Sequence, residues 1–233
     1  MAIRRILIVE DQALARTYLR SCVEKCTDCE VADTLTRADA ALHRCAAGDI
    51  DLILMDICTE NDSDGLIAAE EIKKHYPEIK ILMVTSMLEG RFLDRAEEIG
   101  ADSFWYKDSP SDDLIGVIEG TLSGKHFWPD GTPSVMLGNV LSCDLSEQEL
   151  KTLRLLCEGK TNAEIAARLN VAESSVRTYI NRMLEKTGYQ NRNRLMVAAV
   201  GKRLVVPDSR LGRTEKNESQ SAEHGDESTR KQI

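Results

Sequence analysis

The sequence lacks the marks of a membrane or secreted protein. No apolar run approaches the ~18 residues that cross a bilayer, and the first residues, Met-Ala-Ile-Arg-Arg, do not have the layout of a secretory signal. Seven cysteines are an odd number, so a disulfide framework is not expected. We therefore expect a cytoplasmic protein that does not bind membranes.

The cysteines also lack the spacing of a metal site. Cys22, Cys26 and Cys29 form a C-x3-C-x2-C cluster. A structural zinc site needs a fourth ligand at a similarly tight spacing, and the sequence offers none. Cys22 and Cys26 are four residues apart on a predicted helix, so they are expected to face one core.

Apolar residues are scarce in residues 207–233, which are predicted to form a disordered polar tail. The rest of the chain is long enough for two domains. Residues 1–141 carry a net charge of −12 and residues 142–206 one of +4. An acidic first part and a basic second part fit a metal-binding or signalling module joined to a nucleic-acid-binding module. Uneven surface charge is the simpler interpretation of the same numbers.

Strand and helix patterns alternate over residues 1–123. Near-continuous apolar runs, which are typical of buried parallel strands, and shorter β-type runs predict strands at 3–9, 30–33, 51–55, 79–84 and 103–106. Helical periodicity predicts helices at 13–26, 36–47, 65–75, 89–99 and 111–122. Five β/α units predict an α/β fold with a doubly wound five-stranded parallel sheet of the flavodoxin-like type.

Turn-forming residues mark the end of this unit. Residues 124–141 contain Gly124, Pro129, Gly131, Pro133 and Gly138, and we interpret this segment as a linker. Residues 142–206 have no strand signal until their end, and helices are predicted at 146–158, 161–168, 173–187 and 191–202. The second domain is therefore predicted to be all-α, with four helices.

Polar residues stand at the carboxyl ends of three predicted strands. Glu10 and Asp11 follow the first strand, Asp56 the third and Thr85 the fourth. Functional groups gather at this edge of open α/β sheets, so these side chains are expected to meet. Three acids and a hydroxyl suggest a Mg²⁺ pocket with one carboxylate left to act as a nucleophile. Taken singly, each has a plainer role; Asp11, for instance, would cap a helix.

Residues 1–123, with these groups at the strand ends, resemble the receiver domain of bacterial response regulators. The matching positions are Glu10 and Asp11 (acidic pair), Asp56 (phosphoacceptor), Thr85 (switch hydroxyl), Phe104 (switch aromatic) and Lys107 (lysine). The resemblance implies that Asp56 accepts a phosphoryl group and that Lys107 and Thr85 contact its oxygens. It also implies Mg²⁺ as cofactor. The implied ligands are Glu10, Asp11, Asp56 and the backbone carbonyl of Cys58.

The sequence departs from the receiver pattern in two places. The loop Cys58–Gly65 contains no proline and is one residue longer than is usual in the family. Glu10 stands where Asp is commoner. Both differences bear on loop geometry and on the lifetime of the phosphoryl group more than on the chemistry itself.

Residues 142–206 resemble the helix-turn-helix output domain of the LuxR type. The similarity lies in Leu145–Glu149, Gly159–Ala166, Val171–Tyr179 and Lys186–Arg192. It implies that the helix at 173–187 enters a major groove, where Arg177 reads a base and Asn181 reads adenine. The expected DNA contacts are Lys160, Asn162, Ser174, Ser175, Arg177, Thr178, Tyr179, Asn181, Arg182 and Lys186. A protein-binding helical bundle is the alternative for this segment.

Together the two parts resemble a response regulator of the NarL/FixJ class. The resemblance implies a transcription regulator rather than an enzyme, phosphorylated by a sensor histidine kinase. It would bind double-stranded promoter DNA as a homodimer, with RNA polymerase as a further partner. One alternative is a DNA-binding regulator whose receiver is a phosphorylation-independent dimerisation module. Another is a phosphatase that uses an aspartyl phosphate, but that class needs a second acid where this chain has Cys58.

Overall fold

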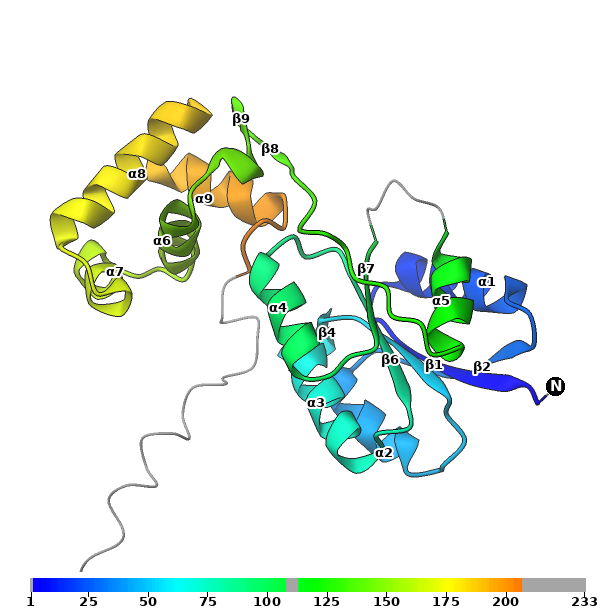
Figure 1. Cartoon of the computed structure of the whole chain (residues 1–233). Coiled ribbons are helices and arrows are strands. Elements are labelled where there is room, and N and C mark those ends of the chain that lie inside the picture. The colour runs from blue at the N-terminus through cyan, green and yellow to red at the C-terminus, as the bar shows by residue number, and fades with distance from the viewer. Residues whose placement is uncertain (1, 108–112, 207–233) are drawn as a thin grey trace, which may run out of the picture.

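The computed structural model describes residues 2–107 and 113–206, and its first part is a five-stranded sheet (Figure 1). The strands are β1 (Arg4–Val9), β2 (Cys29–Leu35), β3 (Leu52–Met55), β6 (Lys80–Thr85) and β7 (Ser103–Tyr106). They lie in the order β2-β1-β3-β6-β7, and neighbouring strands pair in parallel. The predicted doubly wound sheet is thus confirmed. The carboxyl ends of β1, β3, β6 and β7 lie side by side.

Helices cover both faces of this sheet. One face carries α1 (Ala13–Lys25) and α5 (Leu114–Leu122), and the other carries α2 (Ala41–Cys45), α3 (Gly65–His75) and α4 (Gly90–Glu98). Successive strand residues point to opposite faces, so Ile6 and Ile8 join one core while Leu7 joins the other. Because both faces are buried, the strands need apolar residues at every position, which explains the continuous apolar runs.

Two segments differ from their predicted form. The helix predicted at 36–47 is a 3-10 turn, Ala38–Ala40, followed by the short α2. The loop after Asp56 folds into a hairpin of β4 (Cys58–Thr59) and β5 (Ser63–Asp64) around a 3-10 turn, Glu60–Asp62.

The hydroxyl of Thr59 links these two segments. It accepts a hydrogen bond from the Ala38 N–H (3.0 Å) and donates one to the Ser63 carbonyl (2.8 Å). Asn61 takes a left-handed conformation, with φ of 60°, which allows the tight turn. The longer loop is therefore accommodated by pairing within itself.

The segment 124–141 is packed against both domains. Its residues 126–128 run along the outer edge of β7, where the Phe104 N–H donates to the Phe127 carbonyl (2.8 Å). Trp128 stacks on Phe104, with ring centroids 6.3 Å apart. Further on, β8 (Met136–Leu137) and β9 (Val140–Leu141) form a hairpin whose Leu137 is buried in the helical domain. Large apolar side chains explain this packing, whereas the prediction of a linker rested on proline and glycine.

The helical domain has the four predicted helices. They are α6 (Glu147–Cys157), α7 (Asn162–Leu169), α8 (Glu173–Thr187) and α9 (Arg192–Gly201). Ser146 and Thr161 begin α6 and α7 as capping boxes, each paired with a glutamate three residues on. The predicted domain boundaries (1–123, 124–141 and 142–206) stay a prediction. The predicted tail, 207–233, and residues 111–112 of the predicted final receiver helix lie outside the described residues.

Asp102 offers a test of the receiver core. Its buried carboxylate accepts hydrogen bonds from Lys73 Nζ (2.5 Å), Lys80 Nζ (3.0 Å) and the Ile81 N–H (2.9 Å). Burial alone would raise the pKa of Asp102, but these donors outweigh it and hold the pKa below its usual value. Asp102→Asn should lower the free energy of unfolding by about 3 kcal/mol at pH 7, because it removes the negative charge that pairs with the two ammonium groups.

The Asp102 carboxylate also predicts that the stability of the protein depends on pH. A depressed pKa in the folded state stabilises the protein above the unfolded pKa of about 4, and this stabilisation is lost as the pH falls through the folded value. Urea unfolding between pH 7 and pH 3 should show the loss in the wild type, and the difference from Asp102→Asn should shrink. A difference that stays constant down to pH 3 would contradict this account.

Candidate functional site

An acidic pocket lies at the carboxyl edge of the sheet. Glu10 follows β1, Asp56 follows β3, Thr85 ends β6 and Lys107 follows β7. Glu10, Asp56 and Thr85 are buried. The ammonium of Lys107 forms ion pairs with Glu10 and with Asp56, at 2.8 Å from Asp56 Oδ2. Because these four strands are neighbours, the sheet brings together residues that are up to 97 positions apart.

Backbone groups hold the side chains of the pocket in place. The Ile57 N–H donates to Asp56 Oδ1 (2.8 Å), and the Met87 N–H donates to Thr85 Oγ1 (3.1 Å). Gly65 begins α3 directly beside Asp56. A Cβ at Gly65 would lie 1.9 Å from the Asp56 carbonyl oxygen, so only glycine permits this approach.

Arg16 is a residue of the pocket that sequence reasoning missed. Its guanidinium, on α1, donates to the backbone carbonyls of Glu10 (2.8 Å) and Asp11 (3.1 Å). It therefore fixes the acidic turn between β1 and α1. An arginine five residues after an acid on a helix is common on protein surfaces, so the sequence carried no distinctive signal.

The pocket contains more acidic groups than basic ones. Burial raises the pKa of Asp56, and Glu10 adds to the rise, while Lys107 opposes it. Burial would lower the pKa of Lys107, but Asp56 and Glu10 outweigh burial and raise it, so Lys107 stays charged. One ammonium group thus faces three carboxyl groups.

The acids fit Mg²⁺. Glu10, Asp11 and Asp56 each offer a carboxylate oxygen, and these oxygens lie within 4.8 Å of one another. Asp11 Oδ1 is buried and has no hydrogen-bond partner among the described residues, so a cation would satisfy it. Carboxylate oxygens are the ligands that Mg²⁺ prefers. Cys58, in β4, is half-buried, and its carbonyl stays a predicted ligand.

Phe104 lies inside the receiver rather than at its surface. It is buried, makes an edge contact with Tyr106 at a centroid distance of 5.0 Å, and stacks with Trp128. The predicted switch aromatic is therefore linked directly to the segment that leads to the helical domain.

The expected DNA-binding side chains gather on α8 and the start of α7. Figure 1 shows these two helices on the side of the helical domain that is turned away from the sheet. Most of the predicted contacts on α8 are exposed, namely Ser174, Arg177, Thr178, Asn181 and Arg182, whereas Lys160, Asn162, Ser175, Tyr179 and Lys186 are half-buried. Val176, Ile180 and Met183 form the opposite, buried face of α8.

Family comparisons agree with both halves of this arrangement. Residues 6–119 match the model described as "Response regulator receiver domain", and residues 144–199 match "Bacterial regulatory proteins, luxR family". The chain is a response regulator with a LuxR-type DNA-binding domain.

Individual proteins resemble this response regulator over most of its length. Response regulator protein VraR of Staphylococcus aureus strain Mu3 is 29% identical over 206 residues, which cover 86% of this chain and 98% of VraR. A structure of two RcsB dimers bound to two parallel DNAs aligns with a TM-score of 0.56 at 20% identity, over 85% of this chain and 98% of RcsB. A LuxR-family response regulator from Aurantimonas sp. SI85-9A1 aligns with a TM-score of 0.51 at 25% identity, over 55% and 92% of the two chains.

None of the helices in the described part of this response regulator is long and apolar enough to span a bilayer.

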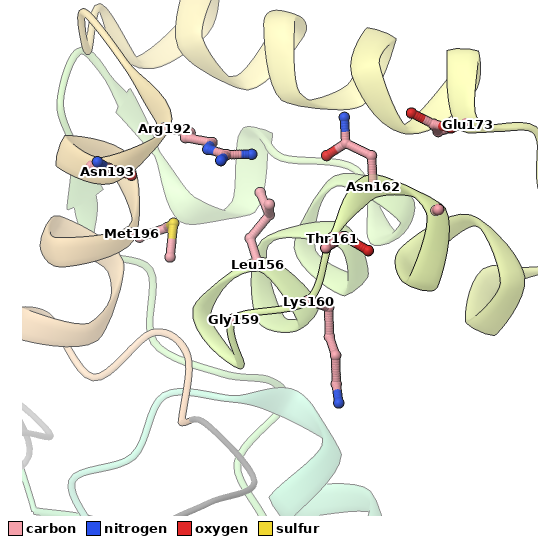
Figure 2. Close-up of a pocket in the computed structure, with 10 residues that line it drawn as sticks. Leu156, Gly159, Lys160, Thr161, Asn162, Glu173, Arg192, Asn193 and Met196 are labelled. Carbon is pink, nitrogen blue, oxygen red and sulfur yellow. The ribbon is translucent and has the colours of Figure 1, made fainter.

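A cavity of about 390 Å³ opens beside the predicted DNA-binding face. It lies where α6 ends and where α7, α8 and α9 begin (Figure 2). Arg192 and Asn162 point into it from opposite sides in Figure 2. The sequence analysis had not singled out Arg192, since Arg192 begins the final helix, outside the helix-turn-helix pair.

Lys186 differs in its surroundings from the other predicted DNA contacts. Its ammonium donates to Glu149 Oε2 (2.8 Å) and to the Asp144 carbonyl (3.0 Å), and Glu149 is buried. The pair ties the end of α8 to the start of α6. This engagement favours a structural role for Lys186 over a phosphate contact.

Lys186→Ala provides a test of this role. The change should leave Glu149 without its main partner and lower the free energy of unfolding of the response regulator by about 1–2 kcal/mol. At a temperature where the variant is folded, the salt dependence of DNA binding should match that of the wild type. The comparison variant is Arg182→Ala, on the exposed face of α8, which should flatten that dependence without loss of stability. A flatter salt dependence in Lys186→Ala would instead indicate that Lys186 contacts a DNA phosphate.

Proposed function

We propose that this response regulator is a phosphorylation-controlled regulator of transcription that accepts a phosphoryl group on Asp56 from a sensor histidine kinase. The observation that carries the proposal is the buried Asp56, held by Lys107 beside an Asp11 oxygen that lacks a partner among the described residues. Glu10, Asp11, Asp56 and the Cys58 carbonyl would hold Mg²⁺. When bound, Mg²⁺ would neutralise charge on the transferring group.

The residues of the pocket suit an attack on phosphorus. Lys107 and the Ile57 N–H each bind one oxygen of Asp56, which orients the carboxylate. A bond forms between an Asp56 oxygen and phosphorus, while the bond between phosphorus and the histidine nitrogen of the kinase breaks. Lys107 then pairs with an oxygen of the phosphoryl group, and Thr85 donates its hydroxyl to a second oxygen. The pocket thus carries out a single phosphoryl transfer, and the acceptor is its own residue Asp56.

The output would be binding of promoter DNA by a homodimer. One helix-turn-helix makes few base and phosphate contacts, and pairing two units raises the effective concentration at the second half-site. The solved structure of RcsB dimers bound to DNA supports this assembly in a protein of the same fold. RNA polymerase would be a further partner on the promoter. A receiver that only dimerises would have no use for a cation-binding acidic pocket with a bridging lysine, which disfavours that alternative.

Labelling of Asp56 tests the receiver half of the proposal. Incubation with acetyl phosphate and Mg²⁺ should add one acid-labile phosphate, detected by intact mass. Asp56→Asn should abolish the labelling, as should chelation of Mg²⁺. The matched control is Asp64→Asn, which alters the nearby cap of α3 and should still be labelled. One phosphate on Asp56→Asn, at another residue, would refute the assignment.

Arg177 tests the output half. Arg177→Ala should cost ~1–3 kcal/mol in binding to the specific site and should relax the preference at one base pair. The side chain forms an exposed ion pair with Glu173 (2.6 Å), which DNA would have to replace. Binding titrations on a set of single-base variants of the operator would measure the effect. Equal weakening on specific and random DNA would mean that Arg177 contacts a phosphate.

A further inference from the structure

Two free cysteines stand together at the edge of the sheet opposite to the acidic pocket. Cys26 directly follows α1, and Cys29 is the first residue of β2, where it pairs with Arg4 of β1. The segment Cys26-Thr27-Asp28-Cys29 has the spacing C-x2-C. This spacing brings two thiols to one short turn and is typical of redox-active pairs.

The thiols of Cys26 and Cys29 contact each other. Cys26 Sγ donates to the Cys22 carbonyl (3.3 Å), and Cys29 Sγ donates to the Thr27 carbonyl (3.4 Å). The two thiols also hydrogen-bond with each other. The remaining approach to the length of an S–S bond, about 2 Å, is short.

Neighbouring elements hold the two residues between the cysteines in place. The Thr27 N–H donates to Glu119 Oε1 of α5 (2.8 Å), and the Arg4 N–H of β1 donates to the Asp28 carbonyl (2.7 Å). Asp28 takes a left-handed conformation, with φ of 54°, which turns the chain from α1 into β2 (Figure 1). Because the turn is fixed from two sides, each thiol meets the other at a high effective concentration.

The two thiols differ in their access to solvent. Cys26 is only 7% exposed, whereas Cys29 is half-buried. Burial raises the pKa of Cys26 to about 12. Burial also raises the pKa of Cys29, but the hydrogen bond with Cys26 and the charge of Arg4 oppose that rise. Cys29 is therefore the thiol that a reagent in solution meets first, and Cys26 is placed to attack it from inside the protein.

A metal site is the other use of clustered cysteines. Cys22 lies one helical turn before Cys26 and is also buried. Within the described part of the chain, however, the only group of three or more His, Cys, Asp or Glu side chains compact enough for a metal ion is Glu10, Asp11 and Asp56. The structure therefore favours a bond between two sulfurs over a metal ion held by three.

We propose that Cys26 and Cys29 form a reversible redox pair, which a low-molecular-weight disulfide oxidises. The thiolate of Cys29 attacks one sulfur of this oxidant, whose S–S bond breaks, and one thiolate leaves and takes up a proton from solvent. Cys26 then loses its proton, attacks the Cys29 sulfur and displaces the second thiolate. Two protein thiols thus lose two electrons to form a disulfide, and the small disulfide is reduced to two thiols. The site is separate from the acidic pocket and does not depend on the proposed function.

Equilibration of the full-length protein in glutathione buffers tests this pair. The raised pKa values leave little thiolate at neutral pH, so the exchange is slow and must be followed until it stops changing. Samples are then quenched with acid, alkylated and digested. Trypsin cleaves after Lys25 and after Arg37, so both cysteines lie in one peptide, 26–37.

In oxidising buffer, the peptide 26–37 should be lighter by two hydrogen atoms and should carry no alkyl group. The occupancy of this disulfide should be at least tenfold above that of any other cysteine pair. The exposed Cys143 reports reaction at an isolated thiol. A peptide that stays reduced, or carries glutathione on both cysteines, when Cys143 is already glutathionylated would overturn the proposal. So would a disulfide that joins Cys26 to any cysteine other than Cys29.

Two variants test the order of attack. Cys26→Ala has no second thiol to displace glutathione, so Cys29 should accumulate the mixed disulfide at least tenfold above the wild type. In Cys29→Ser, the buried Cys26 should remain a thiol. The matched control is Cys143→Ser, which should form the disulfide as the wild type does. Equal glutathione adducts on the two test variants would overturn the proposed sequence of steps.

Discussion

The ammonium of Lys107, set between two buried carboxylates, is the interaction on which the receiver depends. Without it, burial of Asp56 and the neighbouring Glu10 would together favour the protonated form of Asp56. With it, three carboxylates and one ammonium leave two net negative charges. A divalent cation would neutralise these two charges. The lysine therefore favours the ionised form of Asp56, the proposed phosphoacceptor, and the pocket still fits the proposed Mg²⁺.

The pocket connects to the DNA-binding domain through the two strands at one side of the sheet. β6 ends in Thr85, whose loop leads within four residues to Glu89 at the domain junction. β7 carries Phe104, which packs against Trp128 of the connecting segment. Both routes start from residues that are proposed to respond to a phosphoryl group on Asp56. Under the proposed function, a rearrangement in the pocket would therefore affect buried contacts between the domains.

The DNA-binding domain depends on a different set of polar contacts. Capping boxes begin α6 and α7, and the buried pair of Glu149 and Lys186 joins α6 to α8. These contacts fix the scaffold on which α8 presents its exposed side chains. The basic residues of the DNA-binding domain thus have two roles. Lys186 forms an ion pair within the domain, whereas Arg177 and Arg182 face solvent.

Local patterns in the sequence determined the strands, most of the helices and the identity of the pocket residues. The apolar runs of β1, β3 and β6 could be recognised because both faces of the sheet are buried, and Asp56, Thr85 and Lys107 stand at strand ends that any parallel sheet would align. Tertiary structure alone decided the packing of residues 124–141, the hairpin after Asp56, the role of Arg16 and the internal pairing of Lys186. It also decided the position of residues 203–206 against Glu89. The packing of residues 124–141, the pairing of Lys186 and the contacts of residues 203–206 join residues far apart in the chain, and a polar or apolar side chain carries no local signal of the partner that the fold will bring to it. The hairpin after Asp56 and the contacts of Arg16 are local, but the residues that form them carry no distinctive signal in the sequence.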